Sequence, residues 1–137
     1  MAADPEYLRF FVDESLLGLG KALSFARRDV VHSGHALVTD APTGASDEQW
    51  IPAVAARGLV VIGRDKHLRT RPAEIALWKE HGLRVFEIAG KRDLQTWDYL
   101  SRLVRRWDDI EARLEHRGST PWCFRVFDRS LKEVDLA

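Results

Sequence analysis

The amino-acid sequence predicts one α/β domain over residues 1–137, in three layers, with a mostly parallel central sheet flanked by helices. Two observations lead to this prediction. Short apolar runs rich in valine and isoleucine alternate with longer segments in which apolar residues recur every three or four positions, as in strand–helix–strand units. In addition, the chain length and a hydrophobic content of 45% are those of an ordinary globular domain.

The N-terminal part of the chain predicts two strands and a helix. An apolar run at residues 8–12 ends in Asp13 and indicates a buried strand. Apolar residues at helical spacing then predict a helix over residues 16–25. Residues 29–32 are a candidate for a second, short strand, and a polar loop follows it.

The next unit is a helix followed by a strand. Ser46, with Gln49 three residues later, forms a capping-box pattern that begins a helix, and Gly58 ends it. The run at residues 59–62 is typical of a strand buried on both faces of a parallel sheet. We expect the glycine, arginine and aspartate at 63–65 to terminate that strand.

Further strands and one more helix are expected after residue 71. Pro72, at a first helical position, predicts a helix that runs toward Gly82. Residues 83–88 resemble another strand. The short apolar runs at residues 122–127 and 131–134 are separated by turn residues and predict a hairpin.

A long helix is expected between the strand at residues 83–88 and the apolar run at residues 122–127. Asp93 can cap it, apolar residues repeat along one face at helical spacing, and Gly118 ends it. Trp97 and Trp107 lie in that apolar stripe, so we expect them in the core or at an interface. The mixed arginines and acids elsewhere on the helix predict an exposed face with salt bridges.

Composition narrows the function classes. Lysine plus arginine equals aspartate plus glutamate at 21 each, so any contact with nucleic acid must come from a local basic patch. Cys123 is the single cysteine, which excludes an intrachain disulfide. The first residues do not resemble a signal peptide, and no run approaches the roughly 20 apolar residues of a membrane span. We therefore expect a cytoplasmic protein.

Three aspartates occupy positions where a ligand site is expected. Asp13 follows the first strand, Asp65 follows the strand at 59–62, and Asp47 lies in the first turn of the helix that leads into that strand. In proteins with a parallel sheet, ligands bind beyond the carboxyl ends of the strands. Carboxylates that converge there repel one another unless a cation is present, and Mg²⁺ or Mn²⁺ favours such oxygen ligands.

Each aspartate alone also has a structural explanation. Asp13 can favour a helix N-terminus, and Asp47 behind a serine fits ordinary helix-dipole chemistry. Asp65 can be a turn residue. Their joint placement at strand ends is what favours a metal site that would activate water for phosphodiester hydrolysis.

Three segments carry a resemblance to a known family. Residues 10–15, Phe-Phe-Val-Asp-Glu-Ser, resemble the opening of PIN domains, in which a strand ends in an aspartate followed two residues later by serine or asparagine. Residues 46–50 resemble the second acidic motif of the PIN-like subgroup related to VapC toxins, and residues 59–66 resemble its third motif. The resemblance is good over residues 8–72.

The resemblance implies a ribonuclease that depends on Mg²⁺ or Mn²⁺ and acts as the toxin of a toxin–antitoxin pair. It implies that Asp13, Asp47 and Asp65 are the metal ligands and catalytic residues. Glu14, Ser15 and His67 would support these ligands by contacting them or their waters, without binding the ion directly. A cognate antitoxin protein and a homodimer are expected from the resemblance alone.

One departure concerns His67. PIN relatives have a further acid two residues after the third-motif aspartate, so His67 leaves a second metal without support. His67 could contact phosphate, bind a softer ion or shuttle a proton, or it could be a solvated loop residue. Around Asp65 a group of basic residues could hold RNA phosphates or form a solvated loop: Arg64, Lys66, Arg69 and Arg71.

Two rival functions remain open at this stage. A phosphorylation receiver also places acids after the first strand and an aspartate after a later one, although no later strand ends in the lysine that receivers require. A degenerate PIN-like module that binds proteins without efficient catalysis is the second rival, and the departure at His67 favours it. His32 and His35 lack an acid or cysteine neighbour that would complete a zinc site, so we interpret them as structural or loop residues.

Overall fold

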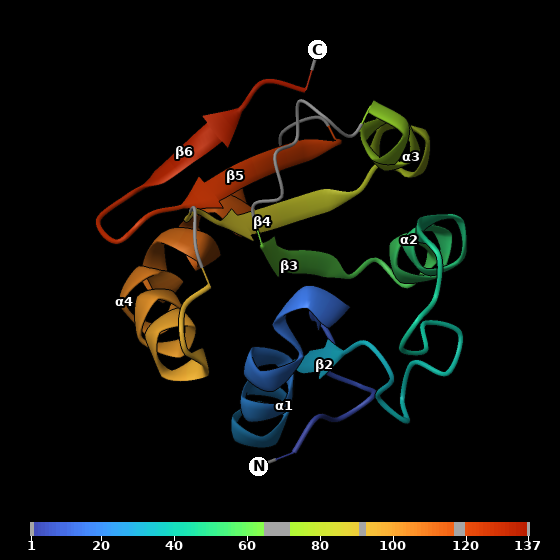
Figure 1. Ribbon diagram of the computed structural model, residues 1–137, viewed down its shortest axis with the longest axis horizontal. Coiled ribbons are helices and arrows are strands. Elements are labelled where there is room, and N and C mark those ends of the chain that lie inside the picture. The colour runs from blue at the N-terminus through green and yellow to red at the C-terminus, as the bar shows by residue number, and fades with distance from the viewer. Residues whose placement is uncertain (1, 65–71, 91–92, 117–119, 137) are drawn as a thin grey trace.

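The computed structural model describes residues 2–64, 72–90, 93–116 and 120–136. Strands and helices alternate along the described chain (Figure 1). The strands are β1 (Phe10–Val12), β2 (Val30–His32), β3 (Val60–Arg64), β4 (Arg84–Ile88), β5 (Trp122–Val126) and β6 (Leu131–Val134). The helices are the 3₁₀ turn η1 (Glu14–Leu16), α1 (Leu17–Ala26), α2 (Asp47–Ala56), α3 (Pro72–His81) and α4 (Thr96–Glu115).

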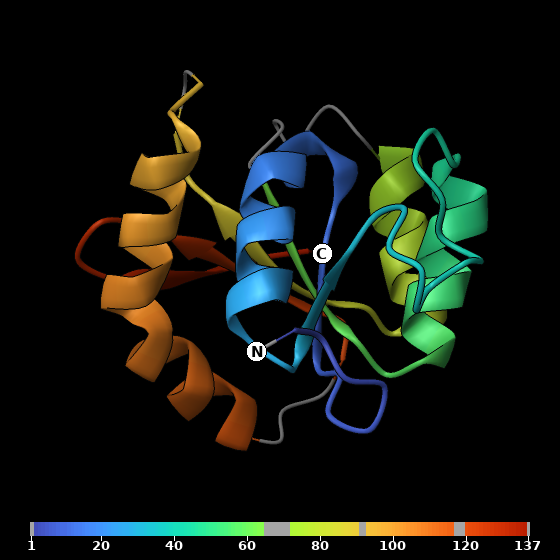
Figure 2. The same cartoon turned by 90° about the horizontal axis from the view of Figure 1, so that it is seen from below.

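The strands of the described chain form one sheet in the order β2-β1-β3-β4-β5-β6. All neighbouring pairs are parallel except β5 and β6, which form the expected antiparallel hairpin. Helices α1 and α4 cover one face of the sheet, and α2 and α3 cover the other (Figures 1 and 2). The predicted three-layer α/β fold with a mostly parallel sheet is therefore confirmed.

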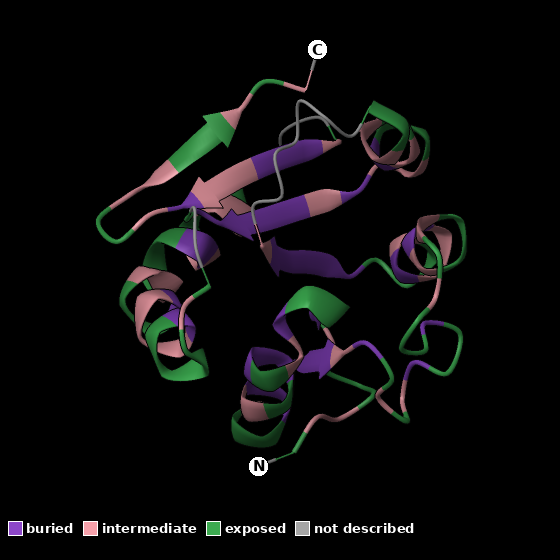
Figure 3. Ribbon diagram, viewed as in Figure 1, coloured by how far each residue is buried: buried purple, intermediate pink, exposed green. Residues whose placement is uncertain are grey.

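Alternation of side chains divides the core into two halves. Phe10 and Val12 point toward α1 and α4, whereas Phe11 between them packs with residues of α2 and α3. β1, β3, β4 and much of β5 are buried, while β6 and the outer sides of the helices are exposed (Figure 3). A strand that is covered on both faces needs a continuous apolar run, and this is the pattern at residues 59–62.

The order of the strands creates a switch point at β1. After β1 the chain forms β2 on one side of it and then crosses over to form β3 on its other side. The connections that follow β1 and β3 therefore run in opposite directions from these two paired strands. In open parallel sheets the crevice at such a point, beyond the carboxyl ends of the strands, is where ligands bind. Helices α1, α2 and α4 all begin at this carboxyl edge (Figure 2).

The opposite, amino edge is held by an ion-pair network. Asp29, which is almost fully buried, accepts hydrogen bonds from Arg27 Nε at 2.8 Å and Arg9 Nη2 at 3.0 Å. Arg9 also forms an ion pair with Glu111 on α4. Burial alone would raise the pKa of Asp29, but the bonds from Arg27 and Arg9 outweigh it and lower the pKa below its ordinary value. The network joins β1 and β2 to α4.

Helix α4 is anchored at the carboxyl edge by a largely buried arginine. Arg102 donates hydrogen bonds to the carbonyl oxygen of Ala89, directly after β4, and to that of Val126, the last residue of β5. Its Nε donates to Asp128 Oδ1 at 3.1 Å. Its side chain is only 12% exposed. The expected charged face therefore carries a salt bridge at this position, but Arg102 is not exposed as predicted.

Several local predictions require correction. Strand β3 continues through Gly63 and Arg64 because both pair with β4, so these residues do not terminate it. Ser46 is the N-cap of α2, but its side chain makes no capping hydrogen bond, and the expected capping box does not form. Gln95, not Asp93, is the N-cap of α4.

The C-terminal end and the outer face of α4 also differ from expectation. The helix ends at Glu115, and Gly118 lies outside the described residues. Trp97 is not in the core, because 72% of its surface is exposed. Trp107 packs against the core as expected, with its ring centroid 5.1 Å from that of Phe10.

Candidate functional site

Asp13 lies at the switch point, directly after β1. Its backbone N–H donates to the carbonyl oxygen of Ile62 at 3.0 Å, which extends the β1–β3 pairing by one residue. The extended backbone of Asp13 makes it the N-cap of η1, and its carboxylate accepts a 2.9 Å hydrogen bond from Ser15 N and another from Ser15 Oγ. The carboxylate is thus oriented by the turn that immediately follows it.

A glycine in the neighbouring strand provides space for this carboxylate. A Cβ atom placed on Gly63 would lie 2.8 Å from Asp13 Oδ2, closer than non-bonded contacts allow. The carboxylate of Asp13 therefore occupies the position above β3 that a side chain at residue 63 would fill. Without a glycine there, Asp13 could not hold this orientation.

Glu14, the next residue, makes a different contact. Its carboxylate oxygens accept hydrogen bonds from the backbone N–H of Gly44 at 3.1 and 3.0 Å. The side chain therefore ties η1 to the loop that precedes α2. Ser15, in contrast, contacts Asp13 directly and orients its carboxylate.

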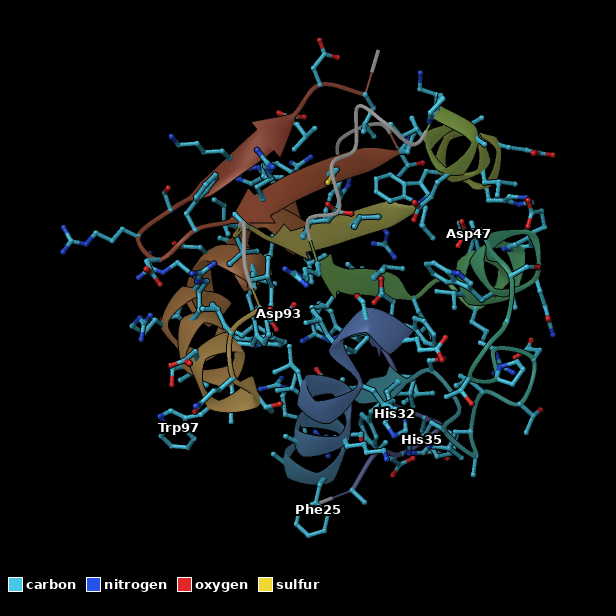
Figure 4. The ribbon with its side chains drawn as sticks, in the orientation of Figure 1. Phe25, His32, His35, Asp47, Asp93 and Trp97 are labelled. Carbon is cyan, nitrogen blue, oxygen red and sulfur yellow. The ribbon has the colours of Figure 1, made fainter. Side chains whose placement is uncertain are left out.

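Asp47 is the first residue of α2 and is oriented by a tryptophan. Its Oδ1 accepts a 3.0 Å hydrogen bond from Trp50 Nε1. The ring of Trp50 in turn stacks on Phe11 of β1, with centroids 5.7 Å apart and an angle of 20° between the planes. The orientation of Asp47 therefore depends on the core beneath α2, and Figure 4 shows this aspartate on the α2 side of the molecule.

The described residues contain no group of three or more histidine, cysteine, aspartate or glutamate side chains placed to hold a metal ion. They leave out Asp65, the third aspartate of the predicted set. His67, Lys66, Arg69 and Arg71 also lie outside the described part of the chain. The expectation of a joint site of Asp13, Asp47 and Asp65 therefore stays a prediction.

Arg64 is the last residue of β3 and lies at the carboxyl edge. Its guanidinium forms an ion pair with Asp93, whose side chain is 85% exposed. The placement of Asp93 in Figure 4, between the sheet edge and α4, follows from this contact. A phosphate can replace an exposed carboxylate as a partner of arginine, because both accept paired hydrogen bonds. The contact with Asp93 was not foreseen, since the sequence predicts a cap there.

His32 and His35 form a pair at the end of β2, where His32 is the register partner of Val12 (Figure 4). Their ring centroids are 5.1 Å apart in an edge-on arrangement. His32 Nδ1 donates to the carbonyl oxygen of Ser33 at 2.8 Å, and His35 Nδ1 accepts from Leu37 N at 3.0 Å. Burial, followed by the nearby His32, lowers the pKa of His35. These bonds fit the structural role predicted for both histidines.

One acidic residue near the site was not singled out from the sequence. Glu87 lies in β4 and is only 5% exposed. In the parallel register it is the neighbour of Gly63 on one side and Arg125 on the other. The sequence feature that could have indicated this residue is its position as a glutamate between Phe86 and Ile88, within a run that otherwise resembles a buried strand.

Comparison with protein-family models shows which family the chain belongs to. A family model described as a PIN-like domain matches residues 8–90, which is more than half of the sequence. The chain belongs to the PIN-like domain family. The matched region of this PIN-like domain runs from β1 through β4 and includes Asp13, Asp47 and Gly63. PIN domains are generally nucleases, so the fold is of a nuclease type.

The other comparisons add no relative. Neither the curated proteins nor the solved structures contain a significant match to this PIN-like domain. The relation to VapC toxins therefore rests on the sequence motifs. No helix of the described residues is long and apolar enough to cross a membrane.

The residues at the switch point fit a hard divalent cation. Asp13 supplies carboxylate oxygens, which Mg²⁺ and Mn²⁺ prefer, and the glycine at position 63 leaves space beside Oδ2. Asp47 carries another carboxylate in the first turn of α2, where its Oδ1 accepts a hydrogen bond from Trp50 Nε1. The carboxylate of Asp13 is thus chemically suited to the metal that the resemblance implies.

Proposed function

We propose that this PIN-like domain is an endoribonuclease that depends on Mg²⁺ or Mn²⁺. Asp13, Asp47 and Asp65 would be the ligands of the ion, with Asp13 at the centre of the site. The observation that carries the proposal is the carboxylate of Asp13 above Gly63, at the switch point of a PIN-like sheet. Both residues lie at the edge where parallel sheets bind ligands.

The residues around the ion would have distinct roles. A bound divalent ion lowers the pKa of a coordinated water and stabilises charge on a phosphoryl oxygen. Ser15 orients Asp13 through two hydrogen bonds, and Trp50 orients Asp47. Such supporting hydrogen bonds typically change metal affinity or activity by roughly 10- to 100-fold.

RNA would be held next to the acids by basic residues. Arg64 lies at the end of β3 and would exchange its contact with Asp93 for a phosphate of the substrate. Lys66, Arg69 and Arg71 are proposed as further phosphate contacts because they follow Arg64 closely in the sequence. The formal charge of zero makes such a local patch necessary for RNA binding.

The rival assignment as a receiver is not favoured. The parallel order β2-β1-β3-β4-β5 is also that of flavodoxin-like receivers, so strand order alone does not separate the two. However, β5 ends in Val126 and is followed by Phe127, where a receiver requires a lysine. The PIN-like family match supports the nuclease instead.

The test of the nuclease proposal is cleavage of labelled RNA in Mg²⁺. We expect the unaltered protein to cleave, and Asp13→Asn or Asp65→Asn to reduce cleavage to background while circular dichroism remains unchanged. Asp108→Asn removes the same charge from an exposed position on α4 and should cleave normally. Absence of both RNA cleavage and Mg²⁺ binding in a calorimetric titration would instead favour the degenerate binding module.

We further propose that the nuclease is the toxin of a toxin–antitoxin pair and forms a homodimer. This part rests on the resemblance of residues 46–50 and 59–66 to the motifs of the VapC-related subgroup. Induced expression should arrest growth, and Asp13→Asn should not. Relief of the arrest by the product of a neighbouring gene would identify the antitoxin, and growth unaffected by the unaltered protein would contradict the toxin role.

A further inference from the structure

A buried glutamate in β4 is the starting point. Glu87 is 5% exposed and lies between Phe86 and Ile88, which are both buried. Transfer of a carboxylate from water into an apolar strand is costly unless it is paired or binds a cation. A glutamate is therefore an unexpected residue at this position of the sheet.

The alternation of side chains shows which face of the sheet Glu87 occupies. Phe11, Val61, Val85 and Cys123 belong to the core beneath α2 and α3. Two residues further along each of these four strands, toward the carboxyl edge, the same face carries a second row: Asp13, Gly63, Glu87 and Arg125.

An independent observation agrees with this placement. The pKa of Cys123 is raised, first by burial and then by the negative charge of Glu87. Glu87 is therefore close enough to Cys123 for its charge to act on the thiol, which points to the α2 and α3 face. Glu87 and Asp13 thus share the α2 and α3 face, on either side of Gly63.

The spacing across Gly63 suits two ligands of one cation. Neighbouring strands lie about 4.8 Å apart. Asp13 Oδ2 is already above β3, 2.8 Å from where a Cβ of Gly63 would be, and Glu87 is the register neighbour of Gly63 on β4. Oxygen ligands at about 2.1 Å from Mg²⁺ lie within about 4 Å of each other. The Asp13 carboxylate therefore lies above β3, one strand spacing from β4, and Gly63 offers no side chain of its own at that position.

Arg125 completes the row on the other side. It is the register neighbour of Glu87 on β5 and carries the opposite charge. A purely structural role for Glu87 would need only this neighbour. It would not require a glycine at position 63, or an aspartate directed over that glycine.

We propose that Glu87 is a further acidic residue of the metal site, which reaches the cation held by Asp13 across Gly63, directly or through one water, with Arg125 as a positioning residue. This inference rests on the proposed function, because it needs the cation at Asp13. It assigns to the site a residue of β4 that no acidic motif of the sequence includes.

The test is Mn²⁺ affinity, measured on the full chain by electron paramagnetic resonance of free Mn²⁺. Glu87→Gln keeps the shape of the side chain and removes its charge, and we expect it to weaken Mn²⁺ binding by roughly 10- to 100-fold. Glu115→Gln is the matched control, because it makes the same change at the far end of α4 (Figure 2). At the same Mn²⁺ concentration, the melting temperature of the control should also rise by more than that of Glu87→Gln.

Several outcomes would overturn the inference. If Glu87→Gln binds Mn²⁺ as tightly as Glu115→Gln does, the inference is overturned, whereas the proposed nuclease function is unaffected. If Glu87→Gln does not fold, the double variant Glu87→Gln with Arg125→Gln removes both charges of the row. A folded double variant that binds Mn²⁺ normally would show that the pair is only structural.

The unaltered protein provides a measurement that is independent of folding of the variants. In Mn²⁺-soaked crystals, an anomalous peak shared by Asp13 and Glu87 supports the inference. A peak at Asp13 with the Glu87 carboxylate more than about 5 Å away, beyond the reach of one bridging water, contradicts it. Failure of the unaltered protein to bind Mn²⁺ at all would contradict both this inference and the proposed function.

Discussion

The carboxylate of Asp13 lies above the backbone of Gly63, and a Cβ at residue 63 would approach its Oδ2 to 2.8 Å. The two residues come from different strands and are 50 positions apart in the sequence. They meet because β1 and β3 pair in parallel and Asp13 extends that pairing by one residue. The orientation of the central acid of the site therefore depends on a glycine in the neighbouring strand.

Gly63→Ala should displace the carboxylate of Asp13. The added methyl group requires a shift of Asp13 or of β3, at a cost of about 1–3 kcal/mol in the free energy of unfolding. We expect Mn²⁺ affinity to fall by roughly tenfold or more, as it does when a ligand loses its support. Isothermal titration calorimetry and urea denaturation measure the two effects.

Gly20→Ala is the control for this substitution. Its Cβ would lie 2.6 Å from His32 Cβ and 3.1 Å from Val12 Cβ, under α1 and on the other face of the sheet. It should destabilise the fold by a similar mechanism without a specific loss of Mn²⁺ affinity. Equal losses of affinity in the two variants would show that the effect of Gly63→Ala comes from general destabilisation.

Trp50→Phe should release Asp47 while keeping most of the packing. The phenyl ring can still stack near Phe11, but the 3.0 Å hydrogen bond from Nε1 to Asp47 is lost. We expect about 0.5–1.5 kcal/mol of lost stability and a decrease in Mn²⁺ affinity of up to roughly tenfold. Trp97→Phe, at an exposed position on α4, should change neither. Unchanged Mn²⁺ affinity in Trp50→Phe would argue against Asp47 as a ligand.

Asp29→Asn should destabilise the amino edge of the sheet at neutral pH. The variant loses the charge that Arg27 and Arg9 contact, and we expect a cost of about 1–3 kcal/mol. Asp40→Asn is a control that breaks an exposed pair with Arg57, for which we expect a cost below about 1 kcal/mol. Urea denaturation at pH 7 compares the two, and equal effects would contradict the importance of the buried network.

The same variant has a defined pH dependence. The native pKa of Asp29 lies below the ordinary value of 3.8, so its stabilising contribution is complete above that value and is lost as pH falls through the lowered pKa. The difference in stability between the unaltered protein and Asp29→Asn should therefore shrink below about pH 4. A difference that stays constant from pH 7 to pH 3 would contradict the lowered pKa.

His35→Asn should reduce the sensitivity of the fold to mild acid. The native pKa of His35 is lowered from 6.5, so the unfolded chain binds a proton more readily than the folded protein. Stability that is present above pH 6.5 is thus lost as pH falls toward the lowered pKa. Asparagine can still accept from the backbone N–H of Leu37 but does not titrate. Identical melting temperatures against pH for the two proteins would contradict this account.

Much of the fold could be predicted from local patterns. The α/β class follows from strand and helix periodicity, and α3 begins at Pro72 as expected because its fixed backbone angle suits a first helical position. Asp13 lies after a strand as predicted, since an apolar run that ends in an acid indicates the edge of a sheet. These features depend on residues close together in the sequence.

The errors and omissions concern contacts between distant residues. Gly63 suggested a strand end by its type, but pairing with β4 keeps it inside β3. Asp93 could serve as a cap by its position, but Arg64, 29 residues earlier, binds its carboxylate. Glu87 is hidden in an apolar run, and only the register of three strands places it next to the site. Such relations depend on topology, which local patterns do not encode.

The most direct test of the central claim is anomalous diffraction from crystals of the unaltered protein soaked in Mn²⁺. The account predicts a peak about 2.1–2.2 Å from a carboxylate oxygen of Asp13, on the side that Gly63 leaves open. Asp13→Asn crystals treated in the same way should lose that peak. A Mn²⁺ peak elsewhere on the molecule, or none within coordination distance of Asp13, would contradict a metal site at the switch point of the sheet.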